Sequence, residues 1–581
     1  MRMRITSIVF MLLVLAFPAF SAAQRLSIEI TGVDKAMEEN VRAFMSIARE
    51  EKSRGLTGPR VRRLYNKSLE ELHIALQPFG YYTPKVESAL EASAEGWRAV
   101  YRIDPGKPVR VTKVDIVILG EGAEDLDLAA LVGGFPLQQG DVFIHARYEE
   151  GKRLLLRRAL NNGYLNSSYV EHQVRIYPAR HAAEIRLVLA SGIRYHFGKV
   201  TFSDAVVKPE LLARFSDIKD GEPYATQKLF DLQNALFDSD YFSQVDVTPR
   251  PDAAIGRKVP VFVDLRPSKR HRYSIGIGYG TDTKLRGSLG YNNRRINRRG
   301  HRFRSTLRFS RLRKSLSAGY IVPFRDPRTD FWEIMATMRN ENPDNGREED
   351  SYILGVSRQT SPRKNWIETW YLDYRRDSFR LSDEFGESKL LVPGLTIDRI
   401  KGKSKDNIQD GNRITLEFRG GHEKLFSDVS FFQPLLTVKI IQSITQRNRL
   451  LLRGDAAATV ISGFGELPLS LRYYAGGDTS VRGYGYQQLG PKNSRGDPIG
   501  ARQKLIGSLE YDYRFRENWS IAAFMDTGNA FDNWNDFTLE RGAGFGLRWY
   551  SPVGPLRIDV AWPVSVGDKE PRLHIIFGPE L

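Results

Sequence analysis

The sequence predicts a chain of two parts: α+β modules first, then an all-β, 16-stranded antiparallel transmembrane barrel. Three observations support this fold class. Strand and helix patterns alternate up to about residue 267, where the helical period of apolar residues disappears. From residue 268 to residue 581, strand-like segments and turns follow one another almost without interruption. Many of these strands are charged on one face and apolar on the other, which suits a wall between lipid and a polar lumen.

The chain begins with the three parts of a secretory leader, or signal peptide, which we assign to residues 1–23. Arg2 and Arg4 form the charged start, an apolar run extends from residue 8 to residue 17, and Ser21 opens a small-residue cleavage site. The alternative is a membrane anchor, but the apolar run is too short to span a bilayer comfortably. Since no other segment approaches a transmembrane helix, a membrane role would have to come from strands.

Composition disfavours several classes of function. The chain contains no cysteine, so it can form no disulfide, thiolate metal site or cysteine nucleophile. The formal net charge is +17, and the basic residues are spread over many strands rather than gathered in one arm or helix. Lumen walls and lipid headgroups explain that distribution better than nucleic acid does. We therefore expect a lipid bilayer and no nucleic acid among the partners, and no metal or other cofactor.

A repeated motif divides the first part into three modules. Gly80-Tyr81, Gly163-Tyr164 and Asp240-Tyr241 each follow an amphipathic helical run and open a strand, at intervals of about 80 residues. A second repeat begins at Val109 and again at Tyr195. Each unit therefore consists of one strand, two helices and two strands. We place the modules at residues 24–107, 108–191 and 192–267. The alternative is a single, outsized α+β domain.

Sixteen candidate strands follow within residues 268–581, from near Arg272 to near Phe577. An even number closes an antiparallel barrel whose two ends lie on one side of a membrane. Closure is required because an open sheet edge in hydrocarbon leaves backbone groups unpaired. The alternative is a secreted all-β protein with an amphipathic sheet. Aromatic residues that would supply the interfacial girdle are Trp366, Trp370, Tyr371, Trp519, Trp549 and Trp562.

A turn-rich segment between the eleventh and twelfth strands, about residues 463–500, contains Val481-Arg482-Gly483-Tyr484. Its glycines permit close backbone approach, and its tyrosines can pack a loop into a cavity. The string resembles the V-R-G-Y loop of the outer-membrane assembly and two-partner-secretion superfamily, in which this loop folds back into the barrel lumen. Downstream, Phe524-Met525-Asp526-Thr527-Gly528 resembles the F-x-D-x-G strand motif of the same superfamily.

The resemblance implies that Arg482 contacts Asp526. Asp526 shares its parity with Phe524 and Gly528, opposite Met525, so alternation also places its carboxylate in the lumen. A guanidinium and a carboxylate can pair through two parallel hydrogen bonds, which would hold the loop in one place. We expect Gly528 to leave room for the loop. The alternative is a solvated arginine and an unrelated lumen carboxylate.

The first and last strands form the predicted seam of the barrel. The first strand carries three glycines on one face, which weakens strand order and packing, and the last strand is short. The predicted seam residues are Gly276, Gly278, Gly280, Leu573, Ile575 and Phe577. In the superfamily this junction is described as a lateral gate, and a parted seam would offer unpaired backbone to an incoming strand. The alternative is that the glycines simply accommodate the folded loop, and both can hold.

We expect no catalytic site. The nine histidines are scattered, without an H-E-x-x-H motif, a G-x-S-x-G motif or a metal-ligand spacing. Barrel lipases need a histidine and a serine on neighbouring strand ends, and His574 and Ser565 are the nearest candidates. One histidine beside a serine is common by chance, so the residues favour a protein that is not an enzyme.

Along nearly the whole mature chain, three modules before a barrel resemble the TamA branch of the superfamily, whose modules are polypeptide-transport-associated (POTRA) domains. This resemblance implies a bacterial outer-membrane location with periplasmic modules and a TamB-like, inner-membrane-anchored partner. It also implies unfolded outer-membrane proteins or autotransporters as substrates, with phospholipid movement as a further role. One departure is the four residues after Phe577, since barrel signals commonly end on an aromatic residue. The alternatives are a two-partner-secretion exporter, which passes one cognate protein through the lumen, and a passive pore or receptor.

Overall fold

The computed structural model describes most of the chain after the expected leader. The described residues are 25–51, 53, 56–93, 96–203, 205–343, 346–402, 410–551, 554–565 and 570–577. The leader assigned to residues 1–23 and the four residues after Phe577 lie outside them. Within the described part of the chain, no helix is long and apolar enough to cross a membrane.

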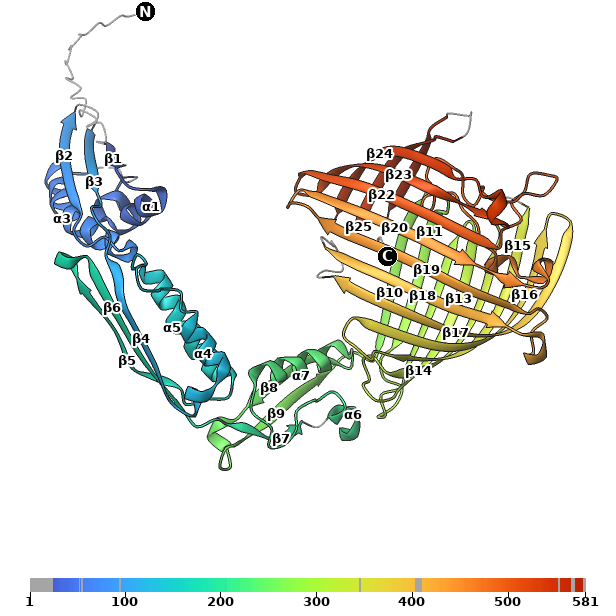
Figure 1. Ribbon diagram of the computed structural model, residues 1–581, viewed down its shortest axis with the longest axis horizontal. Coiled ribbons are helices and arrows are strands. Elements are labelled where there is room, and N and C mark those ends of the chain that lie inside the picture. Colours follow the sequence, from blue (N-terminus) through green and yellow to red (C-terminus); the bar gives the residue numbers. More distant parts are fainter. Residues whose placement is uncertain are drawn as a thin grey trace, which may run out of the picture. The chain divides into compact units, whose positions relative to one another are not determined.

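The first module is a three-stranded sheet of order β1-β3-β2, packed against helices (Figure 1). Its elements are β1 (Arg25–Thr31), α1 (Lys35–Phe44), α2 (Ser46–Arg49), α3 (Gly58–Leu76), β2 (Lys85–Ser93) and β3 (Gly96–Asp104). β1 lies parallel to β3, and β2 lies antiparallel to it. Apolar side chains on one face of the helices, including Val41 and Leu72, form the core with the sheet.

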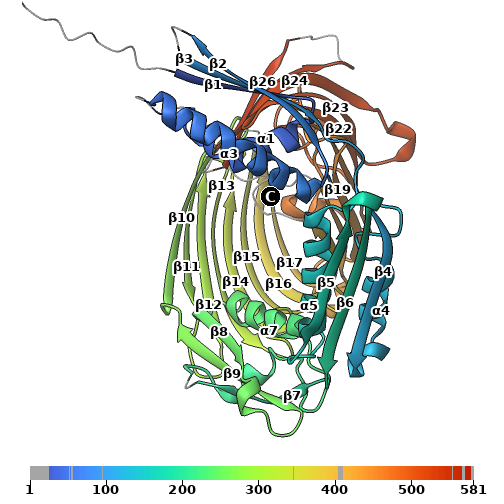
Figure 2. The same ribbon diagram turned by 90° about the vertical axis from the view of Figure 1, so that its left-hand side faces the viewer.

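The second and third modules repeat this order, with sheets β4-β6-β5 and β7-β9-β8. The second contains β4 (Arg110–Gly120), α4 (Leu126–Gly133), α5 (His145–Asn161), β5 (Ser168–Tyr177) and β6 (Ala182–Gly192). The third contains β7 (His196–Phe202), α6 (Pro209–Ala213), α7 (Thr226–Asp238), β8 (Phe242–Pro249) and β9 (Lys258–Pro267). In the second module, α5 runs alongside β5 and β6 (Figure 2). Each predicted module range contains one such unit to within one residue.

The repeated motif forms the joints between consecutive units. Its first residue has a left-handed backbone in every copy: φ is 91° at Gly80, 95° at Gly163 and 67° at Asp240. Glycine adopts this conformation without steric cost, and aspartate is one of the few other residues that tolerate it. The Gly80 carbonyl accepts a hydrogen bond from Val109 N at 2.8 Å, and the Gly163 carbonyl accepts one from Tyr195 N at 2.9 Å. The turn that ends each helix therefore holds the chain where it enters the next module.

The third joint connects the last module to the barrel through side chains as well. The Asp240 carboxylate accepts a hydrogen bond from Arg294 at 3.2 Å and lies 3.6 Å from the guanidinium of Arg272. The buried Tyr241 hydroxyl donates to the carbonyl of Gly300, in the turn between the second and third barrel strands. Two ion pairs of Asp240 and the hydroxyl of Tyr241 thus connect this joint to the start of the barrel.

The second part is a closed antiparallel barrel, which confirms the predicted fold class. β20 and the short β21 share one of its 16 positions, because both pair with β19. The strands lie side by side at a tilt (Figure 1). They are β10 (His271–Gly280), β11 (Lys284–Asn293), β12 (Arg302–Ser310), β13 (Arg313–Pro323), β14 (Phe331–Glu341), β15 (Arg347–Thr360), β16 (Trp366–Leu381), β17 (Glu384–Gly402), β18 (Gly411–Gly421), β19 (Phe431–Ser443), β20 (Asn448–Ala458), β21 (Val460–Ile461), β22 (Gln503–Arg516), β23 (Trp519–Phe531), β24 (Glu540–Ser551), β25 (Gly554–Pro563) and β26 (Arg572–Phe577).

The two faces of the barrel wall have opposite polarity. On β22, Leu509 and Tyr511 are exposed on the outer face, whereas Glu510 and Asp512 are buried on the inner face. A strand with this alternation separates lipid from a polar interior without leaving charge in hydrocarbon. The lumen is therefore lined with charged side chains that are available to bind a loop.

Tyr371 does not belong to the predicted aromatic girdle. Trp366 and Trp370 lie on the exposed face of β16, but Tyr371 has the opposite parity, and its hydroxyl donates to Glu417 at 2.6 Å. The prediction was wrong for this residue because neighbours in a strand face opposite sides, so Trp370 and Tyr371 cannot both face lipid.

Candidate functional site

The segment of residues 462–502 between β21 and β22, here called the lumen loop, binds inward-facing side chains of several wall strands. The backbone N–H of Ser470 donates to Glu349 of β15 at 2.6 Å, and Gln433 of β19 donates to the carbonyl of Leu471 at 2.8 Å. At the outer end of the loop, Arg495 pairs with Asp383, and both side chains are exposed. These contacts fold the predicted loop back into the barrel.

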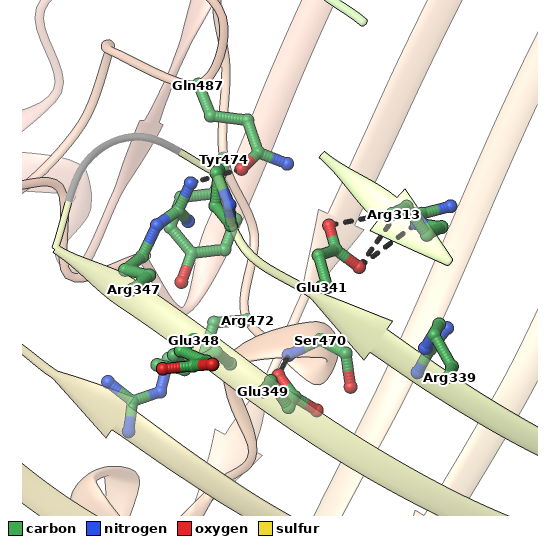
Figure 3. A pocket seen from close by; sticks show the side chains of 12 residues that line it. Arg313, Arg339, Glu341, Arg347, Glu348, Glu349, Ser470, Arg472, Tyr474 and Gln487 are labelled. Atoms are coloured by element: carbon green, nitrogen blue, oxygen red, sulfur yellow. Dashed lines mark hydrogen bonds and ion pairs between the residues drawn. The ribbon is translucent and has the colours of Figure 1, made fainter. Parts of the chain in front are cut away.

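A pocket of about 110 Å³ lies between the lumen loop and β13 to β15 (Figure 3). Its lining is mostly charged and internally paired: Arg313 and Glu341 form an ion pair at 3.0 Å on neighbouring strands. The guanidinium of Arg347 lies 4.0 Å from the centroid of the Tyr474 ring, which belongs to the loop. The close view shows these side chains turned toward one another (Figure 3). The pocket is therefore part of the attachment of the loop to the wall.

Arg482 is the centre of the loop's binding to the opposite part of the wall. Its Nε and Nη2 donate to the two carboxylate oxygens of Asp526 at 2.7 and 2.9 Å, and its backbone N–H donates to the same carboxylate at 3.0 Å. The guanidinium lies 3.4 Å from the centroid of the Phe524 ring. Arg482 is 6% exposed and Asp526 0%. The structure thus brings the V-R-G-Y and F-x-D-x-G motifs into direct contact; their role in function stays a prediction.

Three further charged residues complete the Arg482 cluster: Glu510 of β22, Arg548 of β24 and Asp559 of β25. Arg482 Nη1 donates to Glu510 at 2.8 Å and to Asp559 at 3.1 Å. Arg548 donates to Glu510 at 2.9 Å and also to Asp559. Buried charges persist when opposite charges and hydrogen bonds surround them, as they do here. These three residues are not predicted from the sequence: alternation places them in the lumen, but no sequence signal shows which lumen charges meet the loop.

Glycines allow the lumen loop to approach the wall closely. A Cβ at Gly542 of β24 would lie 1.9 Å from the carbonyl oxygen of Arg482, and Gly483 has a left-handed φ of 95° against the backbone of β25. The prediction for Gly528 was wrong. A Cβ there would lie 2.3 Å from the carbonyl oxygen of Leu505, so this glycine makes room for β22 rather than for the loop.

The two remaining residues of the loop motif also contact the wall. Val481 is fully buried in an apolar cluster that includes Ala475 of the loop and Ile506 of β22. The Tyr484 hydroxyl donates to Glu540 of β24 at 2.7 Å. Arg482 therefore lies between two anchors of different chemistry, one apolar and one hydrogen-bonded.

Among the described residues, which end at Phe577, β10 and β26 pair at two positions across the seam, Tyr279–Phe577 and Gly280–Ile576. Of the predicted seam residues, Gly280 and Phe577 belong to these pairs; the others lie on the same strands outside them, namely Gly276, Gly278, Leu573 and Ile575. A Cβ at Gly278 would lie 3.0 Å from the Phe577 carbonyl oxygen, and one at Gly280 would lie 3.5 Å from Asp478 of the lumen loop. The glycine face of β10 therefore adjoins both the last strand and the loop.

Within the described part of the chain, one group of residues brings possible metal-ligand atoms within 4.8 Å of one another: Asp282, Asp478 and His574. His574 Nε2 accepts a hydrogen bond from the backbone N–H of Gly483 at 3.0 Å. A backbone N–H can only donate, so the imidazole proton is on Nδ1, which donates to Asp478 at 2.5 Å. Both imidazole nitrogens are thus engaged by the lumen loop, and the group is a hydrogen-bond cluster.

Ser565, the serine considered with His574 as a catalytic pair, makes backbone contacts. Its hydroxyl accepts a hydrogen bond from Arg541 N at 2.9 Å and donates to the carbonyl of Leu539 at 3.4 Å. His574 is committed to Asp478 and Gly483. That the protein is not an enzyme remains a prediction.

Comparison with known families decides what this architecture is. Residues 270–578 match the Omp85 superfamily domain. The chain belongs to the Omp85 superfamily. Residues 27–105 match the POTRA domain described as TamA domain 1, and residues 195–267 match a POTRA family described as surface antigen variable number repeat. The protein is therefore an outer-membrane Omp85 barrel with N-terminal POTRA domains in the periplasm.

The chain is also similar to individual proteins. The chain is 24% identical over 413 residues to "Outer membrane protein assembly factor BamA" of Nitratidesulfovibrio vulgaris. The matched region covers 67% of this chain and 51% of the relative, so the chain spans about half the length of that relative. BamA of Haemophilus ducreyi lacking POTRA domains 1–3 has a similar structure: the TM-score is 0.66 at 15% identity, covering 81% of this chain and 99% of the other. CdiB of Acinetobacter baumannii matches with a TM-score of 0.45 at 14% identity, covering 81% and 89%. The printed name of the first of these relatives is that of an outer-membrane protein assembly factor.

Proposed function

We propose that this Omp85 protein is the outer-membrane subunit of a translocation and assembly module of the TamA type. It assists the insertion or secretion of autotransporters and other β-barrel proteins, and it takes part in phospholipid transport. The observation that carries this proposal is the match of residues 27–105 to TamA domain 1, in a chain with three modules before its barrel.

The seam is the route that the geometry favours for a substrate strand. The lumen holds a loop bound by buried charges, so passage through it would first require removal of Arg482 from Asp526. At the seam, only Tyr279 and Gly280 of β10 pair with β26 among the described residues. The earlier part of β10 can therefore offer backbone N–H and C=O groups to an incoming strand, which is β-augmentation.

The open edge of the first POTRA domain is the proposed docking place for a TamB-like, inner-membrane-anchored partner. β2 pairs with β3 and, among the described strands, with no other. Its side chains at Glu87, Ala89 and Glu91 are exposed. A strand-rich partner can add to such an edge through main-chain hydrogen bonds.

Photo-crosslinking in living cells tests the partner. The probe is placed at Ala89 on β2, and the matched control is placed at Gln173, an exposed residue on β5, the edge strand of the second module. We expect Ala89 to capture a large inner-membrane-anchored, strand-rich protein and Gln173 to capture less of it. Capture of a secreted passenger protein instead would support the two-partner-secretion exporter and contradict the TamA assignment.

Deletion of the modules distinguishes an assembly factor from a passive pore or receptor. Removing residues 24–266 should abolish autotransporter assembly while the barrel still inserts, which heat-dependent migration in a gel would detect. Full activity without these residues would contradict any proposal in which the POTRA domains receive a partner or substrate.

A further inference from the structure

The described part of the seam relies on side chains more than on backbone pairing. β10 and β26 share two residue pairs, whereas β25 and β26 share six, and β10 and β11 share ten. Thr281, just after β10, adds two bonds: its N–H donates to the Ile575 carbonyl at 3.0 Å, and its hydroxyl accepts from Ile575 N at 2.6 Å. Backbone ladders that are this short need other contacts to stay closed.

The lumen loop supplies those contacts on both sides of the seam. On the β10 side, Asp478 N donates to Asp282 at 2.6 Å, and Asp282 N donates to Asp478 at 3.1 Å. On the β26 side, His574 donates to Asp478 at 2.5 Å and accepts from Gly483 N at 3.0 Å. A single loop carboxylate, that of Asp478, thus binds the first hairpin with one oxygen and the last strand with the other.

We infer that Asp282, Asp478 and His574 form a clasp that keeps the seam closed, so that β10 and β26 part only after Asp478 leaves one of its two partners. The clasp couples the lumen loop to the seam. Asp478 is four residues from Arg482, which is held by Asp526, so a docked loop presents Asp478 between the two strands. An undocked loop withdraws it, and the described part of the seam then keeps its short ladder and the Thr281–Ile575 bonds.

The clasp requires one particular form of His574. With Nε2 accepting from Gly483 N and Nδ1 donating to Asp478, the imidazole is neutral and has a fixed tautomer. Glutamine can replace one of these two bonds but not both, whereas alanine replaces neither. The clasp belongs to the barrel alone, so its test needs neither cargo nor partner.

Thiol labelling in vesicles measures opening of the seam. Because the chain has no cysteine of its own, a single introduced cysteine is the only thiol that can react. Ile576, which pairs with Gly280 and is 8% exposed, is replaced by cysteine (Ile576→Cys) in the full mature chain. A charged maleimide then reacts only when the site opens, so its rate follows the open population. Asp478→Ala and His574→Ala should each raise the rate by about fivefold or more, the effect of losing one net hydrogen bond. His574→Gln should lie between the parent and His574→Ala.

Asp497→Ala is the matched control, because Asp497 binds Ser382 on a distant part of the wall, at 2.7 Å. It removes a loop carboxylate without touching the seam, so its labelling rate should equal that of the parent. Equal rates in the parent, Asp478→Ala and His574→Ala would overturn the clasp. A rise of the same size in Asp497→Ala would also overturn it, since general loosening of the loop would then explain the result. If His574→Ala fails to fold, the labelling rates of Asp282→Ala and Asp478→Ala test the clasp. Neither of these residues lies in a barrel strand.

Discussion

The pair β16–β17 and the pair β10–β26 are neighbours of the same kind in one barrel, yet they are held in different ways. β16 and β17 share 16 residue pairs, a ladder that runs along the whole of β16. In the part of the chain that the structure describes, β10 and β26 share two, and a loop carboxylate also connects β26 to the turn after β10. In hydrocarbon each unpaired backbone group costs several kcal/mol, so a long ladder cannot open. We therefore expect the barrel to part at the β10–β26 seam, where side chains that reach the lumen supply much of the closure.

Substitution of Arg482 should have the largest effect, because Arg482 holds the lumen loop that closes the seam. Arg482→Ala leaves Asp526 buried without its guanidinium, which costs about 3–5 kcal/mol of loop docking. Labelling of Val481→Cys, a position with 0% exposure in the docked loop, should accelerate at least about a hundredfold, and assembly activity should be lost. Arg482→Lys keeps the charge but not the two-pronged geometry and should be intermediate. If Arg482→Ala and Asp526→Ala both yield an unfolded barrel, Arg482 does not serve to position the loop.

Gly542→Ala should have the second largest effect on loop docking. The added methyl group pushes the lumen loop away from β24, although every charged residue of the Arg482 cluster is kept. The added Cβ would lie 1.9 Å from the Arg482 carbonyl oxygen, and overpacking of this kind costs about 1–3 kcal/mol. The same Val481→Cys reporter should label about ten- to a hundredfold faster. Gly465→Ala is the control in the same loop, because a Cβ there meets nothing within 4 Å. Equal labelling in the two variants would show that close approach at Gly542 is unimportant.

Opening of the seam should also depend on pH, through the ionisation of Asp282. This effect should be smaller than the effects of Arg482→Ala and Gly542→Ala. Burial, and then the neighbouring Asp478 carboxylate, raise the pKa of Asp282 to about 6. Because the pKa of Asp282 is raised in the closed state, protonation of Asp282 stabilises the closed seam. This stabilisation is fully present below the ordinary aspartate pKa and is lost as the pH rises through about 6. Asp282→Asn keeps an acceptor and cannot ionise.

Labelling of Ile576→Cys in the parent and in Asp282→Asn measures this effect. At pH 7.5 the parent should label a few-fold faster than Asp282→Asn, and the ratio should fall toward one as the pH is lowered to 5. A ratio that does not change with pH would show that Asp282 does not titrate in the closed seam.

Tyr371→Phe should have the smallest effect, because it alters the long-laddered part of the wall. It removes the hydroxyl bond to Glu417 and should lower the free energy of unfolding by about 1 kcal/mol, measured by urea unfolding in vesicles. The labelling rate of Ile576→Cys should stay at the parent value. A faster rate would show that the seam responds to the wall in general, and the comparison of the two strand pairs would fail.

Local patterns in the sequence were sufficient for the fold and for the centre of the site. Two-residue alternation predicts the barrel and places Asp526 in the lumen, and the motif around Arg482 predicts its partner. The same rule, applied strictly, would have removed Tyr371 from the girdle, since Trp370 precedes it. The repeated Gly-Tyr motif predicts the modules, and the structure adds that it forms their joints, because Gly80 and Gly163 bond the chain entering the next unit.

The rest of the site depends on register between distant strands. Glu510 and Asp559 are two lumen carboxylates among many, and the register of β22 to β25 together with the docked loop brings both to Arg482. Gly528 was assigned to the loop because a motif names it, although the backbone of β22 is what lies against it. Asp282, Asp478 and His574 are far apart in the chain, so no local pattern connects them.

Two contacts of the lumen loop also differ in how they respond to salt, that of Arg495 with Asp383 and that of Arg482 with Asp526. Arg495 and Asp383 are exposed, so dissolved ions screen their attraction, over about 8 Å at physiological ionic strength. Arg482 and Asp526 are buried where ions do not reach, and their attraction is nearly independent of salt. A rise in salinity therefore weakens the Arg495–Asp383 contact and leaves the Arg482–Asp526 contact in place.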